Sequence, residues 1–310
     1  MLGASSWMVD AAALRVTLDR LRLALERPLS LIDSGLGHDR AAIATSLMLI
    51  LSKLGGNHLM PRTMVGHVPE AQVTALKELF VGLSSGWRKR VARILGQEKL
   101  ALVTRLLASP TPDLLRILGR EDHENSHSDL IAWLLTPWRA PAIAPMALRR
   151  LVSSFEQPEA WRTVLDTALA ADVMSIRREM PIGRELANSD DWCRVDIVVS
   201  GPGFVIAIEN KVWSTEHSDQ TATYWGWLEE MRCLKGGLFL SPSGLTAASP
   251  NFQAVSYLEL VSALLEGPVN HAISAGEEIV LASYLKTLAR TILPVEMRAV
   301  IQAAGAKEEQ

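Results

Sequence analysis

The chain contains 310 residues, of which 48% are hydrophobic and 21% are charged, and its formal net charge is −3. This length allows one large domain or two smaller ones, and the apolar content is sufficient for a buried core. The charged fraction argues against a disordered chain, and the net charge excludes a global basic field that would attract nucleic acid.

Cysteine content and N-terminal sequence indicate a cytoplasmic protein. Cys193 and Cys233 are the only cysteines and are not spaced as metal ligands, which suggests a reducing compartment without a disulfide framework. Asp10 and Arg15 interrupt any secretory signal pattern. The most apolar stretch, residues 41–51, is shorter than the roughly 20 residues of a membrane-spanning helix. We therefore expect a soluble cytoplasmic protein that does not contact a membrane.

Residues 9–118 have the pattern of a helical region. Leucines recur at helical spacing at positions 14, 18, 21 and 25. Further helices are predicted over residues 41–54, 69–83 and 84–107. After Pro110, a short helix is expected with Thr111 as its cap and Pro112 in its first turn. Residues 1–118 are therefore predicted to form an all-helical N-terminal region.

From residue 119 onward the pattern becomes a mixture of helices and strands. The predicted helices cover residues 126–135, 144–154, 158–170, 217–234, 258–265 and 277–291. The predicted strands cover residues 175–180, 192–200, 204–212, 237–240 and 254–257. This order is typical of an α/β fold. We expect such a domain over residues 119–295, followed by a C-terminal tail over residues 296–310.

Two of these strands carry charged residues in otherwise apolar runs. Asp196 lies in the first strand, and the tripeptide Glu209, Asn210 and Lys211 ends the second. Side chains alternate between the faces of a strand, so Glu209 and Lys211 share a face and Asn210 points the other way. A hairpin through residues 200–203 would bring Asp196 close to Glu209. Burying such charges is costly, and a divalent metal held by the carboxylates would offset that cost.

This arrangement resembles the PD-(D/E)XK nuclease superfamily, in which an acidic residue precedes an E-x-K sequence on an apolar strand. The proline that names the motif is missing, because Val195 stands before Asp196. Gln220 and Tyr224 fit the Q-x-x-x-Y element of one branch of the superfamily. The resemblance covers about residues 121–290.

A second part of the resemblance lies upstream. Glu124, His127 and Ser128, followed by an apolar helical run, are similar to the E-x-x-H-S opening of one bacterial subgroup. The resemblance implies a restriction-endonuclease-like core, in which a mixed central sheet is flanked by helices. It also implies a Mg²⁺-dependent nuclease, with Mn²⁺ as a substitute, that hydrolyses phosphodiester bonds. DNA is favoured as the substrate, and the implied biology is bacterial or antiviral defence, restriction or repair.

The resemblance also assigns roles to individual residues. Asp196, Glu209 and the main-chain carbonyl of Asn210 would bind the metal. Lys211 would orient or deprotonate the attacking water and stabilise charge on the phosphate. Glu124 would add a carboxylate that reaches the metal through water. Gln220 and Tyr224 would contact substrate or Lys211. Glu179, on the preceding strand, is an additional candidate.

Three alternatives remain open. The E-x-K sequence could form a solvent-exposed salt bridge on an edge strand. His123, Glu124 and His127 match the H-E-x-x-H signature of zinc metallopeptidases, although a capping box of Ser126 and Asp129 would leave His123 outside the helix. The chain could also be a helical interaction protein with a degenerate nuclease core, binding a protein partner or itself through the N-terminal region. The metal requirement distinguishes the three possible functions: a nuclease would depend on Mg²⁺ or Mn²⁺, a peptidase would depend on Zn²⁺, and an interaction protein would need no metal.

Overall fold

The computed structural model describes residues 70–182, 193–212, 216 and 220–293. The chain divides into two compact units, residues 1–82 and 83–310, and the second contains all the elements that follow except the start of α3. The helices predicted around residues 14–25 and over residues 41–54 lie outside the described residues. No helix in the described part of the chain combines the length and apolar character needed to cross a membrane.

Helix α3, Glu70–Ala108, replaces the two helices predicted over residues 69–83 and 84–107. The predicted boundary between residues 83 and 84 is wrong, because the interruption lies at Gly96, with φ 70° and ψ 175°. Only glycine adopts this backbone conformation without steric cost. The part of α3 after Gly96 packs in the larger of two hydrophobic cores, where it buries Leu100, Val103 and Leu106.

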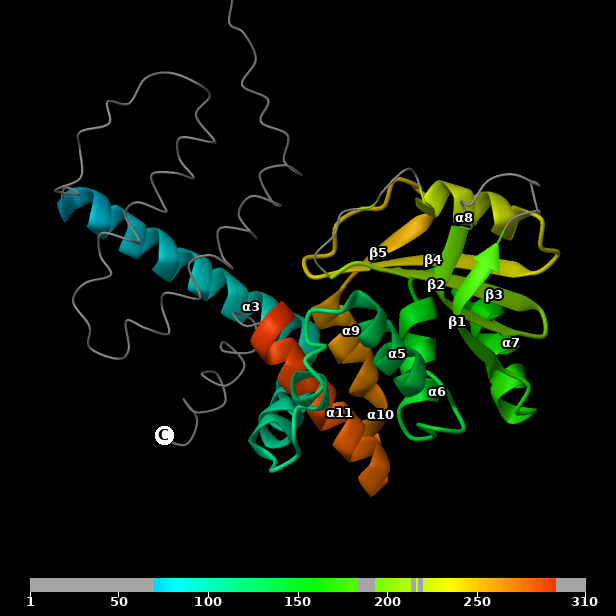
Figure 1. Ribbon diagram of the computed structural model, residues 1–310, viewed down its shortest axis with the longest axis horizontal. Helices are drawn as coiled ribbons and strands as arrows, with labels where there is room; N and C mark the ends of the chain where they lie inside the picture. Colours follow the sequence, from blue (N-terminus) through cyan, green and yellow to red (C-terminus); the bar gives the residue numbers. More distant parts are fainter. Residues whose placement is uncertain (1–69, 183–192, 213–215, 217–219, 294–310) are drawn as a thin grey trace, which may run out of the picture. The chain divides into compact units, whose positions relative to one another are not determined.

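A five-stranded mixed sheet forms the centre of the unit (Figure 1). Its strands are β1 Ser175–Ile182, β2 Cys193–Gly201, β3 Phe204–Asn210, β4 Leu234–Ser241 and β5 Phe252–Ser256, in the spatial order β1-β2-β3-β4-β5. The β1–β2 and β2–β3 pairs are antiparallel, whereas β3–β4 and β4–β5 are parallel. Every residue of β3 is buried, which fits its position in the middle of the sheet.

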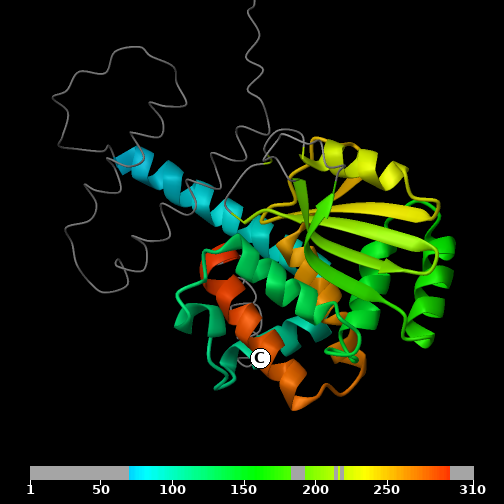
Figure 2. The ribbon, with the colours of Figure 1, turned by 45° about the vertical axis from the view of Figure 1, so that its right-hand side comes forward.

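Helices cover both faces of the sheet (Figure 2). One side carries α5 Glu124–Leu134, α6 Ala144–Val152, α7 Pro158–Ala170, α9 Tyr257–Leu264 and α11 Ala275–Thr287, and the other carries α8 Gln220–Glu229. The short elements are α4 Leu114–Ile117, α10 Glu266–Asn270 and the π-helical turn η1 Leu288–Ile292. This arrangement confirms the predicted α/β core, a mixed sheet flanked by helices.

Alternation along β3 divides its side chains between two cores. Ile206 and Ile208 pack in the larger core with α5, α6, α7, α9 and α11. Val205 and Ala207 pack in the smaller core with Tyr224 of α8. This period of two is what the sequence predicted for a buried strand.

Two predicted helix starts are wrong. The N-cap of α4 is Asp113, whose carboxylate accepts a hydrogen bond from the Arg116 N–H at 3.2 Å, so Thr111 is not the cap. Helix α5 begins at Glu124 after His123, and Ser126 is a buried residue inside the helix. An acidic residue in the first turn is favoured by the positive end of the helix dipole, which explains a start at Glu124.

Gly267 allows the close approach of α10 to the chain before α6. A methyl group added at Gly267 would lie 1.8 Å from the carbonyl oxygen of Ala142. We expect Gly267→Ala to lower the free energy of unfolding by about 2–3 kcal/mol, since a backbone atom cannot yield as a side chain can. Gly226→Ala is the matched control, because Gly226 lies in α8 and the added methyl group would meet no atom within 4 Å apart from neighbouring backbone of its own helix. Urea unfolding should show this control unchanged or stabilised by up to about 1 kcal/mol, and equal effects of both substitutions would contradict the packing argument.

Candidate active site

The site is built where the β2–β3 hairpin ends. The last paired residues of its ladder are Ile197 and Ile208, so the next residue on each strand is Asp196 and Glu209. The backbone N–H of Asn210 donates to Asp196 Oδ2 at 2.8 Å. The structure therefore places Asp196 beside the E-x-K sequence, as the hairpin register predicted.

Lys211 joins carboxylates that come from two different elements. Its Nζ lies 2.5 Å from Glu209 Oε1 and 3.7 Å from Glu124 Oε1. The other oxygen of Glu124 accepts a hydrogen bond from the Val212 N–H at 2.9 Å. The start of α5 is thus attached to the end of β3, and Glu124, Asp196, Glu209 and Lys211 form one cluster.

The alternative of an exposed salt bridge on an edge strand is wrong. Strand β3 lies between β2 and β4, and Glu209 and Lys211 are only 1% and 6% exposed. An ion pair held at this depth carries a large desolvation cost. Surface charge pairing therefore does not account for these residues.

Burial governs the ionisation of the cluster. It raises the pKa of Glu209 to about 7, with repulsion from Asp196 adding to the effect and Lys211 opposing it. Burial also raises the pKa of Asp196 to about 6, opposed by the hydrogen bond from Asn210. Burial has the largest single effect and would lower the pKa of Lys211, but the charge and hydrogen bond of Glu209, together with the charges of Glu124 and Asp196, raise the pKa above its ordinary value. Lys211 is consequently a cation at neutral pH.

The donor set of the cluster fits a divalent cation. Glu209 Oε2 is buried and has no hydrogen-bond partner among the described residues. The three carboxylates of Glu124, Asp196 and Glu209 face the single ammonium of Lys211. In the described residues, no group of three or more His, Cys, Asp or Glu side chains could hold a metal by itself. Two carboxylates with water in the remaining positions are a usual environment for Mg²⁺.

The Q-x-x-x-Y residues lie on α8, against the other face of the sheet. The Tyr224 hydroxyl donates to the carbonyl oxygen of Arg194 at 2.5 Å, and its ring is fully buried in the smaller core. Burial raises the pKa of Tyr224 well above its ordinary range, and the charge of Glu209 adds to this effect. Gln220 Oε1 has no hydrogen-bond partner among the described residues, and no hydrogen bond described there joins Gln220 to the cluster.

The two histidines of the H-E-x-x-H pattern lie in different surroundings. His123 is exposed and precedes α5, with extended backbone angles. His127 is fully buried, and its Nε2 lies 2.8 Å from the carbonyl oxygen of Glu121. Burial lowers the pKa of His127, although the hydrogen bond to Glu121 opposes the shift. The predicted cap at Ser126, which would have separated the two histidines, is wrong, because His123 is itself the N-cap residue of α5. The burial and hydrogen bond of His127 favour a packing role for that residue.

Arg178 on β1 contributes to the site in a way that the sequence did not predict, and it lies next to the predicted candidate Glu179. The guanidinium of Arg178 donates to the carbonyl oxygen of Asp196, to Asp129 Oδ1 at 2.8 Å and to the carbonyl oxygen of Asn125 at 3.1 Å. Glu179 adopts φ 48°, and the β1–β2 ladder leaves it and Asp196 unpaired. A positive φ at a residue other than glycine is strained and is often found at functional sites.

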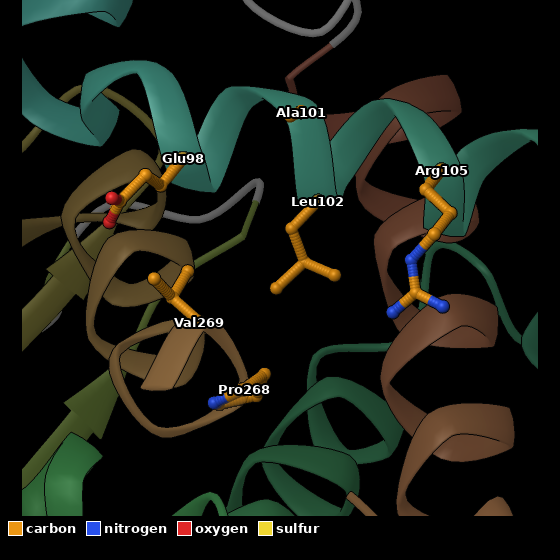
Figure 3. Close-up of a pocket in the computed structure, with 6 residues that line it drawn as sticks. All are labelled: Glu98, Ala101, Leu102, Arg105, Pro268 and Val269. Atoms are coloured by element: carbon orange, nitrogen blue, oxygen red, sulfur yellow. The ribbon is translucent and has the colours of Figure 1, made fainter. Parts of the chain in front are cut away.

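An open pocket elsewhere in the unit does not contain the site. Figure 3 shows Leu102 and Arg105 of α3 on one side of it and Pro268 on the other. Arg105 is paired with Glu278 at 3.2 Å. None of the residues that line this pocket belongs to the charged cluster at β3.

The mixed sheet and the E-x-K cluster at its central strand define a restriction-endonuclease-like α/β protein. A family model described as the PD-(D/E)XK nuclease superfamily matches residues 112–308. The chain therefore belongs to the PD-(D/E)XK nuclease superfamily, and this membership points to a nuclease. No curated protein and no solved structure matches the chain.

The Arg178 contacts predict a local stability effect. Arg178→Ala should lower the free energy of unfolding by about 2 kcal/mol, since hydrogen bonds from a charged donor to Asp129 and two carbonyl groups are lost. Arg177 is the matched control, because it is an exposed arginine on the same strand. Urea unfolding of Arg177→Ala should match wild type, and an equal loss in both variants would show that charge alone is responsible.

Proposed function

We propose that the protein is a Mg²⁺-dependent nuclease that hydrolyses phosphodiester bonds, with DNA as its substrate. The observation that carries this proposal is the convergence of Glu124, Asp196, Glu209 and Lys211 at the end of β3. Superfamily membership supports the reaction class. The site residues support the function, because a fold alone does not determine activity.

Asp196, Glu209 and the main-chain carbonyl of Asn210 are the proposed ligands of Mg²⁺, with Mn²⁺ as a substitute. When bound, the cation polarises the phosphoryl group and lowers the pKa of a bound water. The unpartnered Glu209 Oε2 and the mutual repulsion of the carboxylates support this ligand set.

Lys211 is proposed to orient the attacking water and to stabilise negative charge on the phosphate. Its raised pKa supports a protonated side chain, so positioning and electrostatic stabilisation are favoured over proton abstraction. In the reaction, the water oxygen bonds to phosphorus, the ester P–O bond breaks, and a proton passes to the leaving oxygen. Glu124 is proposed to hold a water of the site, because its Oε1 lies 3.7 Å from Lys211 Nζ.

Tyr224 and Gln220 are proposed to contribute from α8. Tyr224 fixes the strand backbone before Asp196 through the carbonyl oxygen of Arg194. Gln220 Oε1 is buried without a hydrogen-bond partner among the described residues, and Gln220 is proposed to contact substrate. The assignment of the Q-x-x-x-Y element and of the E-x-x-H-S opening to their subgroups stays a prediction.

We also propose a domain organisation and a biological setting, which the superfamily resemblance supports. We assign residues 119–295 to the nuclease core and residues 296–310 to a tail. Residues 1–118 are proposed to bind a protein partner or a second copy of the chain. A cytoplasmic enzyme of this class would act in bacterial or antiviral defence, restriction or repair.

Glu209→Gln and Lys211→Met should each reduce DNA cleavage by about 10²-fold or more, because the first removes a metal ligand and the second removes charge stabilisation. The measurement is cleavage of linear and circular DNA with Mg²⁺, and cutting of the circle would show internal cleavage. Glu230→Gln is the control, since Glu230 is an exposed carboxylate beyond α8. Wild-type cleavage by both site variants would overturn the site assignment.

The cation requirement separates this proposal from a zinc peptidase. We expect cleavage with Mg²⁺ or Mn²⁺ and none with EDTA, since carboxylate oxygens suit hard cations. His123→Ala should leave cleavage unchanged, because His123 is exposed and lies outside α5. Bound zinc in the wild type that disappears in His123→Ala, measured by elemental analysis, would support the peptidase instead.

A further inference from the structure

The side chain of Asn210 is held by three hydrogen bonds beside the cluster. It is fully buried and faces the side of the sheet opposite to Glu209. Its Oδ1 accepts from the Tyr257 hydroxyl at 2.6 Å, and its Nδ2 donates to Ser128 Oγ at 2.9 Å and to the carbonyl oxygen of Glu124 at 3.5 Å. Ser128 and Tyr257 are themselves fully buried.

Hydrogen-bond chemistry fixes the direction of this amide. A backbone carbonyl only accepts, so the group that faces Glu124 O must be the NH₂ of Asn210. The opposite side is then the carbonyl oxygen, and the Tyr257 hydroxyl must donate to it. A buried network with its members paired is rigid, whereas a missing partner leaves a buried polar group unsatisfied.

The network holds three elements of the site in fixed relation. Ser128 and Glu124 belong to α5, Tyr257 opens α9, and Asn210 ends β3. The main-chain N–H of Asn210 also donates to Asp196 Oδ2. A displacement of the Asn210 amide would therefore move the Asp196 and Glu124 contacts together with the backbone between Glu209 and Lys211.

We propose that the Asn210 side chain, held by Tyr257 and Ser128, is a positioning device that sets the spacing of the carboxylates at the metal site. This inference rests on the proposed function, because the spacing matters only if the carboxylates share a cation. Tyr257 and Ser128 are fully buried and bond the Asn210 amide, so in this proposal they act through Asn210. Outer hydrogen-bond partners of metal ligands typically contribute about 10–100-fold to metal affinity or activity.

The test compares Mn²⁺ affinity, measured by calorimetry on the full chain, with DNA cleavage. Tyr257→Phe and Ser128→Ala should each weaken Mn²⁺ binding by about 10-fold or more and lower kcat. Ser128→Thr keeps the hydroxyl and should restore much of the affinity. The matched control is Ser262→Ala on α9, a buried serine whose hydroxyl donates to the carbonyl oxygen of Ile94 at 3.0 Å.

Thermal unfolding separates positioning from general destabilisation. Ser262→Ala should lose stability as Ser128→Ala does and yet bind Mn²⁺ like wild type. Mn²⁺ affinities within twofold of wild type for both Tyr257→Phe and Ser128→Ala would overturn the positioning role and leave the nuclease proposal intact. A wild-type protein that neither binds Mn²⁺ nor cleaves DNA would overturn both.

Discussion

The rest of the site depends on one constraint, the charge of Glu209 at the buried end of the central strand. The Glu209 carboxylate is 1% exposed and pairs with the ammonium of Lys211, and holding this charge at such depth carries a desolvation cost. The hairpin brings Asp196 to the same place, and α5 brings Glu124, so neighbouring elements add negative charge to it. A fold selected for stability alone would place apolar residues there. This accumulation of carboxylates is the feature on which the proposed cation site rests.

The alternation of strand β3 lets one short sequence serve both the chemistry and the core. Glu209 lies on the side of α8, with Tyr224 near its charge, and Asn210 lies on the side of α5 and α9. Lys211, two residues after Glu209, lies on the same side of the sheet and forms an ion pair with it. The strand cannot slip by one residue without burying both charges in the larger core and exposing Asn210 to the site. The packing of β3 therefore fixes the register of the reactive groups.

Local patterns in the sequence predicted β2, β3 and their short connection well, because apolar periodicity and the turn at residues 200–203 act over few residues. They predicted the Asp196–Glu209 approach for the same reason. The pattern underestimated β4, which was expected over residues 237–240 and spans Leu234–Ser241. The pair Gly236 and Gly237 is typical of a strand end in a sequence. In the structure the strand continues through both glycines, because the rings of Phe155 and Phe252 pack directly on them. Arg178 and Tyr257 were missed because their contacts with the site arise from tertiary packing.

The E-x-x-H-S motif at the start of α5 marks the side of this helix that packs against the end of β3 and the neighbouring helices. Glu124, His127 and Ser128 stand at positions i, i+3 and i+4, which share one side of a helix. Glu124 binds the backbone of Val212, Ser128 binds the Asn210 amide, and His127 packs against the rings of Tyr257 and Tyr284. Each residue thus contacts the end of β3 or the helices behind it. The E-x-x-H-S spacing is explained by docking α5 against β3, with the Glu124 carboxylate carried into the site by the same contact.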